Sequence, residues 1–178
     1  HPDIQAVGFV GSSDIAQYIY STAAATGKRS QCFGGAKNHM IVMPDADLDQ
    51  AVDALIGAGY GSAGERCMAI SVAVPVGEQT AERLRARLVE RINNLRVGHC
   101  LDPKADYGPL VTEAALARVR DYIGQGVAAG AELVIDGRER ASDDMTFGDA
   151  SLEGGFFIGP TLFDHVTPDM SIYTDEIF

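Results

Sequence analysis

The residue best suited to covalent chemistry in this sequence is Cys67, in the segment GERCMA at residues 64–69. The segment follows a glycine-rich stretch and precedes an apolar run at 69–76, so we expect the sulfur at the boundary of a buried strand. There a carbonyl substrate could approach both a thiolate and the backbone N–H groups that stabilise an oxyanion. Arg66 would favour the thiolate over a thiol with the usual pKa of about 8.5. The alternative is a small core residue, because free cysteine is often buried.

A second feature could bind an anion. Gly11, Ser12 and Ser13 follow the apolar run at 4–10 and precede a segment with helical spacing that stops at Gly27. The N-terminus of such a helix attracts groups such as a pyrophosphate. The turn lacks the three-glycine fingerprint of the ordinary dinucleotide fold, so a purely structural turn is the alternative.

Strands and helices alternate along the chain and would position both features. The patterns predict strands at 4–10, 39–43, 69–76 and 131–136, and helices at 15–27, 48–60, 78–94 and 112–129. Such alternation is typical of the α/β class with a mostly parallel sheet.

Composition excludes several classes of protein. The chain has 178 residues, of which 46% are hydrophobic and 22% charged, as in ordinary globular domains. Its net charge of −11 repels phosphate backbones and anionic lipids, so neither nucleic acid nor a membrane is an expected partner. No apolar run approaches the roughly 18 residues of a membrane span.

Neither a disulfide framework nor a metal site is expected. Cys32, Cys67 and Cys100 are odd in number and widely spaced, which suits a reducing compartment. The histidines have no partners at metal-ligand spacing, and three of them stand isolated: His39, His99 and His165.

Four segments resemble, in order and spacing, motifs of the aldehyde dehydrogenase superfamily: FVGSSDIA, GGAKN, GERCMA and DEIF. Within it, GAKNH followed by VMPDAD, together with RCMA, most resembles the CoA-acylating methylmalonate-semialdehyde (malonate-semialdehyde) dehydrogenases. The resemblance implies an α/β, aldehyde dehydrogenase-like fold. Its catalytic domain would have an open, mostly parallel sheet and would follow the last strand and helix of a Rossmann-like cofactor domain.

The resemblance also implies roles for individual residues. Cys67 would attack the aldehyde, and after hydride transfer to NAD a thioester would remain on the enzyme. Ser12, next to Gly11, matches the position that meets the cofactor pyrophosphate. Glu176 matches the glutamate that holds the nicotinamide ribose, and Phe178 would lie against the same region.

One departure from the family pattern bears on the final acceptor. Hydrolytic members carry a glutamate two residues before the paired glycines, where it activates water. If Gly35-Ala36-Lys37 is the Gly-Gly-Lys, that position holds Phe33, which cannot accept a proton. Water attack should then be slow and leave the thioester for a thiol, so the resemblance and the chemistry both favour coenzyme A as acyl acceptor. A core aromatic without functional meaning is the alternative for Phe33.

Two residues beside the cysteine have competing interpretations. Arg66 is the candidate for binding a substrate carboxylate, because its planar fork suits bidentate recognition; an ion pair facing away from the site is the alternative. Glu65 is either a displaced base or, preferably, the partner of Arg66. The Cys67 N–H would supply half of an oxyanion hole, and the asparagine that supplies the other half in the family would lie before His1.

We therefore expect residues 1–41 to end an NAD-binding domain and residues 42–178 to form a catalytic domain truncated at its C-terminal end. The start without Met suggests a piece of a longer enzyme, inactive alone, that oxidises malonate or methylmalonate semialdehyde to an acyl-CoA. Alternatives are a hydrolytic aldehyde dehydrogenase and an inactive fragment that only folds or associates. The partners implied are a small aldehyde and further copies in a dimer or tetramer, in the cytoplasm, or in the mitochondrial matrix if the parent is eukaryotic.

Overall fold

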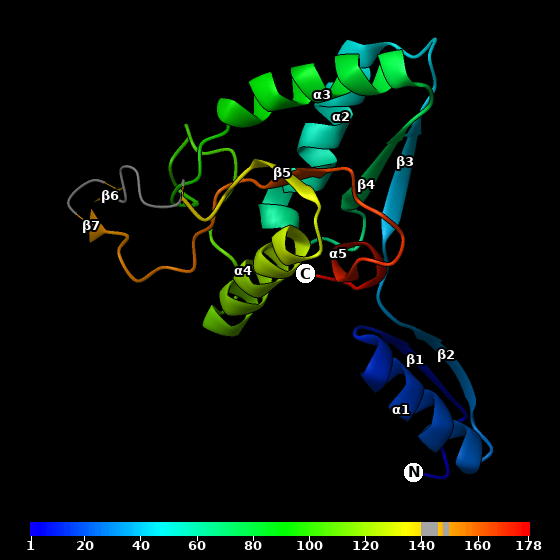
Figure 1. The fold of residues 1–178 in the computed structure, drawn as a ribbon. Helices are drawn as coiled ribbons and strands as arrows, with labels where there is room; N and C mark the ends of the chain where they lie inside the picture. The colour runs from blue at the N-terminus through cyan, green and yellow to red at the C-terminus, as the bar shows by residue number, and fades with distance from the viewer. Residues whose placement is uncertain (140–145, 148–149) are drawn as a thin grey trace. The chain divides into compact units, whose positions relative to one another are not determined.

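The structure, a computed structural model, describes residues 1–139, 146–147 and 150–178. Two compact units make up the chain, His1–Ala36 and Lys37–Phe178 (Figure 1). No helix in the described ranges is both long and apolar enough to cross a membrane.

The first unit is a βαβ element. Strands β1 (Ala6–Val10) and β2 (Arg29–Phe33) pair in parallel, and α1 (Ser13–Ala25) connects them. Gly27 ends the helix because its φ of +69° suits a residue without a side chain. The predicted strand–turn–helix is therefore present. Parallel pairing places the carboxyl ends of both strands side by side, at the start of α1.

The second unit begins with a parallel strand pair. Strand β3 (Asn38–Val42) pairs with β4 (Ile70–Pro75), and α2 (Leu48–Tyr60) followed by the short 3-10 turn η1 (Gly61–Gly64) connects them. The boundary expected after residue 41 falls inside β3. The compact units instead divide after residue 36, because β3 pairs with β4.

Helices α2 and α3 (Glu78–Asn93) form the first core of this unit with β3. The buried apolar residues of this core are Val42, Leu48, Ala51, Val52, Leu55, Leu84, Leu88, Ile92 and Ile135. The three from α3 recur at helical spacing, as the sequence pattern predicted.

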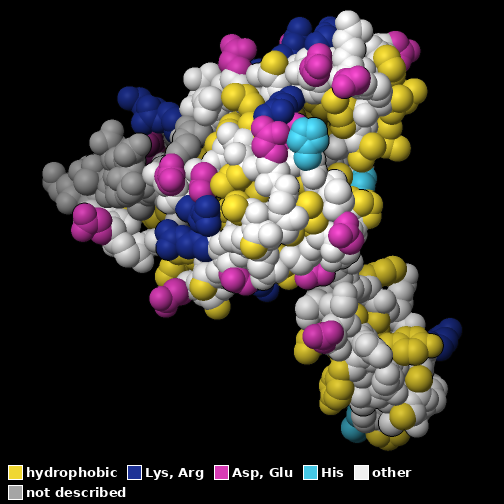
Figure 2. Space-filling view, in the orientation of Figure 1, with side chains coloured by type: hydrophobic (Ala, Val, Ile, Leu, Met, Phe, Trp, Pro, Cys, Tyr) yellow, Lys and Arg dark blue, Asp and Glu magenta, His cyan; other side chains and the backbone are white. Residues whose placement is uncertain are grey.

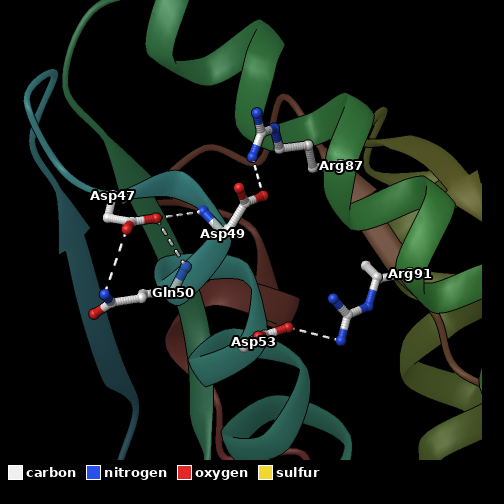
Figure 3. Close-up of polar contacts among 6 residues, drawn as sticks. All are labelled: Asp47, Asp49, Gln50, Asp53, Arg87 and Arg91. Carbon is white, nitrogen blue, oxygen red and sulfur yellow. Dashed lines mark hydrogen bonds and ion pairs between the residues drawn. The ribbon is translucent and has the colours of Figure 1, made fainter.

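Polar contacts fix the outer edge of this helix pair (Figure 3). Asp47 caps α2, since its carboxylate accepts hydrogen bonds from the N–H groups of residues 49 and 50 at 3.0 and 3.2 Å. Asp49 pairs with Arg87, and Asp53 pairs with Arg91 at 2.6 Å. The pairs are exposed, so each contributes little to the stability of the helix pair.

The rest of the unit packs around α4 (Glu113–Ala128). Its buried face joins a second core of Leu110, Ala115, Val119, Ile123 and Ile158. The remaining elements are β5 (Glu132–Ile135), β6 (Thr146–Phe147), β7 (Ala150–Ser151), β8 (Leu162–Asp164) and α5 (Ser171–Thr174). Tyr60 ties α2 to this part because its hydroxyl donates to the Thr161 carbonyl at 3.0 Å, and burial raises the pKa of Tyr60.

The α/β class is confirmed, while the strand pairing is more varied than expected. Among the described residues, β1–β2 and β3–β4 are parallel, whereas β5–β8 and β6–β7 are antiparallel. Each sheet in the described ranges consists of only two strands. The parallel pairs are those joined through a helix, as the geometry of a crossover requires.

Candidate active site

Cys67 lies in a turn between η1 and β4, and its side chain is exposed. The Ala69 N–H donates to the Arg66 carbonyl at 3.0 Å and closes the turn. Before the turn, Ser62 and Ala63 adopt left-handed backbone conformations with φ of +54° and +53°. The exposure of Cys67 contradicts the alternative of a small core residue.

The turn leaves the main-chain amide of Cys67 available. Within the described ranges, the Cys67 N–H donates no hydrogen bond. One exposed residue therefore offers both a thiol that could attack a carbonyl carbon and a free N–H that could bind the resulting oxyanion.

Asn38, the first residue of β3, holds this turn from the side. Its Nδ2 donates to the Cys67 carbonyl at 3.0 Å and to the Ala69 carbonyl at 2.8 Å. A primary amide has two N–H donors, so this pairing uses both of them.

The C-terminal segment lies against the residues that lead into the turn. Gly64 has a φ of +80°, and a Cβ placed on it would lie 2.4 Å from the Phe178 ring. The ring therefore packs directly on the Gly64 backbone, which only glycine permits at this approach. The motif ending in Phe178 and the motif containing Cys67 thus meet within the second unit.

Lys37 links the GGAKN motif to the same C-terminal segment. Its Nζ donates to the Asp175 carbonyl at 2.7 Å. Burial lowers the pKa of Lys37, and the nearby carboxylates of Asp175 and Glu176 partly offset that effect.

His39 adds a contact between β3 and α5. Its Nε2 lies 3.0 Å from the Tyr173 hydroxyl, and its Nδ1 lies 2.8 Å from the Lys37 carbonyl. Because a carbonyl can only accept, the Nδ1–H of His39 donates to the Lys37 carbonyl. Tyr122 of α4 donates to Asp175 at 3.1 Å, and this bond also anchors the C-terminal segment.

The predicted pair between Glu65 and Arg66 is wrong. The Glu65 carboxylate accepts the Val111 N–H at 3.0 Å, and Arg66 Nη1 donates to the Gly57 carbonyl at 3.3 Å. Among the described residues, Arg66 has no carboxylate partner, so the alternative of an ion pair facing away is also not observed. Its exposed guanidinium belongs to the residue directly before Cys67.

Ser12 and Gly11 belong to the first unit, at the start of α1. Ser12 occupies the N-cap position in an extended conformation, and its exposed side chain makes no capping hydrogen bond. The Gly11 N–H donates to the Phe33 carbonyl at 3.1 Å, and the Ser13 hydroxyl accepts the Gly35 N–H at 3.0 Å. Phe33 itself is 53% exposed, so the side chain is no core residue of this unit.

One histidine predicted to stand isolated has acidic neighbours. His165 Nε2 lies 3.5 Å from a carboxylate oxygen of Glu132, and ligand atoms of Glu132, Asp164 and His165 lie within 4.8 Å of one another. Arg85 pairs with both carboxylates. The guanidinium offsets part of their negative charge, which disfavours a cation at this exposed position.

Sequence reasoning missed the roles of Lys37, Asn38 and His39 although it singled out the motif that contains them. Their partners lie far away in the sequence; for Lys37 and Asp175 the separation is 138 residues. No local pattern encodes such a contact. The only available signal was that GGAKN resembled a family motif.

Comparison with known proteins shows which family this chain resembles. The model of the aldehyde dehydrogenase family matches residues 1–178. Malonate-semialdehyde dehydrogenase of Pseudomonas aeruginosa is 56% identical over 177 residues, and malonate-semialdehyde dehydrogenase 3 of Geobacillus kaustophilus is 53% identical over 178 residues. These alignments cover 99% and 100% of this chain but 34% and 35% of the relatives, so the chain spans about a third of their length.

Solved structures show the same likeness. A Sinorhizobium meliloti 1021 protein described as a methylmalonate-semialdehyde dehydrogenase, complexed with NAD, matches with a TM-score of 0.91 and 64% identity, over 99% of this chain and 35% of that one. Methylmalonate-semialdehyde dehydrogenase of Oceanimonas doudoroffii matches with a TM-score of 0.89 and 49% identity, over 97% of this chain and 34% of that one. Likeness along the whole chain shows that it belongs to the aldehyde dehydrogenase family.

Proposed function

We propose that this chain supplies the nucleophile-bearing part of an NAD-dependent, CoA-acylating semialdehyde dehydrogenase. The observation that carries the proposal is the convergence of three motif segments at the Cys67 turn. Asn38 of GGAKN binds the turn, Lys37 binds the C-terminal segment, and Phe178 packs on Gly64. Such convergence is expected where several segments must position one reacting carbon.

The chemistry would begin at Cys67. Its thiolate attacks the aldehyde carbon and forms a C–S bond, while the carbonyl electrons move to oxygen and the free Cys67 N–H binds that oxyanion. A bound NAD would supply the hydride acceptor, so loss of hydride from the carbon would leave a thioester on Cys67. The sulfur of coenzyme A then forms the new C–S bond, and the Cys67 thiolate leaves.

The start of α1 in the first unit suits the binding of the cofactor's pyrophosphate. Ser12 lies exposed at the N-terminus of α1 without capping it, so the positive end of the helix is accessible to an anion. Gly11 has no room for a side chain, because a Cβ there would lie 2.6 Å from the Phe9 ring. We assign the pyrophosphate to Ser12 and Gly11 and the nicotinamide ribose to Glu176, with Phe178 against the same region.

The substrate class follows from Arg66 and from the relatives. A semialdehyde acid brings a carboxylate close to its reacting carbon, and Arg66 is an exposed cation beside Cys67 without a carboxylate partner in the described structure. The relatives are named for malonate and methylmalonate semialdehydes. These substrates differ by one methyl group, which is worth only about 1–3 kcal/mol of discrimination.

Coenzyme A is the proposed acceptor because Phe33 stands at the position of the hydrolytic glutamate. An aromatic side chain cannot take a proton from water, so the thioester would persist until a thiol arrives.

The wider setting is part of the same proposal. The three cysteines are free, as a cytoplasmic protein requires. Basic side chains stand in small groups among acidic ones on the face shown in Figure 2, which favours a small-molecule partner over nucleic acid. We expect the full-length protein to form a homo-oligomer.

The test is whether NADH formation depends on coenzyme A. The full-length enzyme is mixed with malonate semialdehyde and NAD, and absorbance at the NADH band is followed with and without coenzyme A. The proposal predicts one burst of about one NADH per active site without coenzyme A and steady turnover with it. Steady turnover without coenzyme A would instead establish a hydrolytic dehydrogenase.

A further inference from the structure

The main chain on both sides of Cys67 is fixed by hydrogen bonds. The Arg66 carbonyl accepts the Ala69 N–H at 3.0 Å, and this fixes the peptide that carries the Cys67 N–H. The Cys67 carbonyl accepts from Asn38 Nδ2 at 3.0 Å, and this fixes the next peptide. The direction of the thiol depends on both peptides, because they set the backbone angles of Cys67.

In the described part of the chain, the side-chain hydrogen bonds that reach the main chain of this turn from another element come from Asn38. The second proton of its amide reaches the Ala69 carbonyl at 2.8 Å, so a single side chain spans the turn. Asn38 is itself half-buried, and strand β3 pairs with β4 on which the turn ends. A short side chain that starts on a paired strand loses little entropy on binding and can hold its acceptors tightly.

The neighbours of Asn38 anchor the strand end on the other side. Lys37 reaches the Asp175 carbonyl at 2.7 Å, and His39 reaches the Tyr173 hydroxyl at 3.0 Å. Three consecutive residues therefore tie the Cys67 turn and the segment before Glu176 to one point of the backbone. A shift of β3 would move the nucleophile relative to that segment.

We infer that Asn38 is a positioning residue, whose amide orients the Cys67 turn so that the thiol and the free N–H address the same carbonyl carbon and oxygen. The inference rests on the proposed function for the reaction at Cys67, whereas the hydrogen bonds of Asn38 do not depend on which aldehyde is the substrate. Asn38 touches neither the substrate nor the thiol in this account. It acts through the two carbonyls that it binds.

The test uses the full-length enzyme with the variants N38L and N38D. Leucine has a similar size without a donor, and aspartate replaces the donor with an oxygen that repels both carbonyls. The matched controls are N94L and N94D, since Asn94 also donates through Nδ2 to a main-chain carbonyl, that of Glu90 at 3.0 Å, at the far end of α3. Unfolding is monitored for every variant so that loss of fold is recognised.

Three rates are compared. We expect kcat for NADH formation to fall about 10- to 100-fold in N38L and N38D while KM for the semialdehyde changes less than about threefold. The rate at which p-nitrophenyl acetate acylates Cys67, with release of nitrophenolate, should fall in the same proportion. Alkylation of Cys67 by iodoacetamide should stay within about threefold of the unaltered enzyme, because that reaction needs no oxyanion site.

A fall no larger than in the Asn94 variants would overturn the inference. So would a fall in alkylation or in unfolding temperature that parallels the loss of kcat, since Asn38 would then act on the fold alone. If the unaltered enzyme is acylated by the ester but forms no NADH from the semialdehyde, the proposed function fails. The ester arm then still decides whether Asn38 positions Cys67.

Discussion

Arg66 is the residue that we propose recognises the substrate carboxylate. The guanidinium donates to the Gly57 carbonyl and has no carboxylate partner among the described residues, so it can bind the acid group of a semialdehyde. We predict that R66L raises KM for malonate semialdehyde about 10- to 100-fold, as expected from the ~1.5–3 kcal/mol of a charged hydrogen bond. KM for propanal should change less than about twofold.

Arg120 provides the control for that prediction, because it is an exposed arginine on α4. R120L should leave both constants as they are. Equal effects of R66L on the two aldehydes would show that Arg66 does not recognise the carboxylate. Steady-state kinetics with both substrates measures the difference.

Phe33 is the residue that we propose sets the choice of acyl acceptor. A glutamate at this position restores the general base that hydrolytic members carry, and general bases contribute about 10²–10⁴-fold to such steps. F33E should therefore give steady NADH formation without coenzyme A, at least about tenfold above the unaltered enzyme. F33L, which adds no base, should keep the burst. If F33E shows no turnover without coenzyme A, Phe33 is not the reason that the thioester resists hydrolysis.

At the scale of elements, the turn η1 depends on Gly64. Its φ of +80° is left-handed, and a Cβ would lie 2.4 Å from the Phe178 ring. G64A should lower the free energy of unfolding by about 1–3 kcal/mol and reduce kcat, because the Cys67 turn begins there. In G57A the added Cβ meets nothing within 4 Å, so this helical control should be neutral or stabilising. Denaturant unfolding of both variants checks the difference, and equal effects would count against the packing argument.

Helix α2 depends on its cap. Asp47 accepts the N–H groups of residues 49 and 50, so D47A should cost about 1 kcal/mol of stability. D45A is the control, because Asp45 is exposed and outside the cap; it should stay within about 0.5 kcal/mol. Urea unfolding midpoints measure both. A D47A midpoint equal to that of D45A would show that the cap contributes nothing.

The helices could be predicted because their signals are local. Asp47 marks the start of α2, and Leu84, Leu88 and Ile92 recur at helical spacing on α3. The strand pairing could not be predicted in full, since the antiparallel contact of β5 with β8 joins segments separated by a long stretch of chain.

At the scale of the whole molecule, local motifs predicted some residues of the candidate site but not the contacts between distant segments. GERCMA located Cys67 from its neighbours in sequence. The partners of Lys37, Glu65 and His39 depend on how segments far apart in sequence meet, so the predicted pair of Glu65 with Arg66 failed. A single sequence records which residues are present but not which distant carbonyl or hydroxyl each one reaches.

The chain spans about a third of its relatives and leaves large apolar side chains exposed, among them Val10, Tyr18, Phe33, Ile41 and Met68. We predict that the isolated 178-residue chain forms no NADH at any concentration of coenzyme A, because we expect these exposed apolar side chains to need covering before the site is rigid. Its exposed Cys67 should still react with iodoacetamide. NADH formation by the isolated chain would contradict this prediction.

The proposed thioester on Cys67 can be tested most directly by detecting the acyl group on the protein. The full-length enzyme is given malonate semialdehyde and NAD without coenzyme A, quenched in acid, digested and analysed by mass spectrometry, with C67S and C100S alongside. The account predicts an acyl adduct on the Cys67 peptide in the unaltered enzyme and in C100S, and its disappearance when coenzyme A is added. An adduct on another residue, or NADH formation by C67S, would contradict the account.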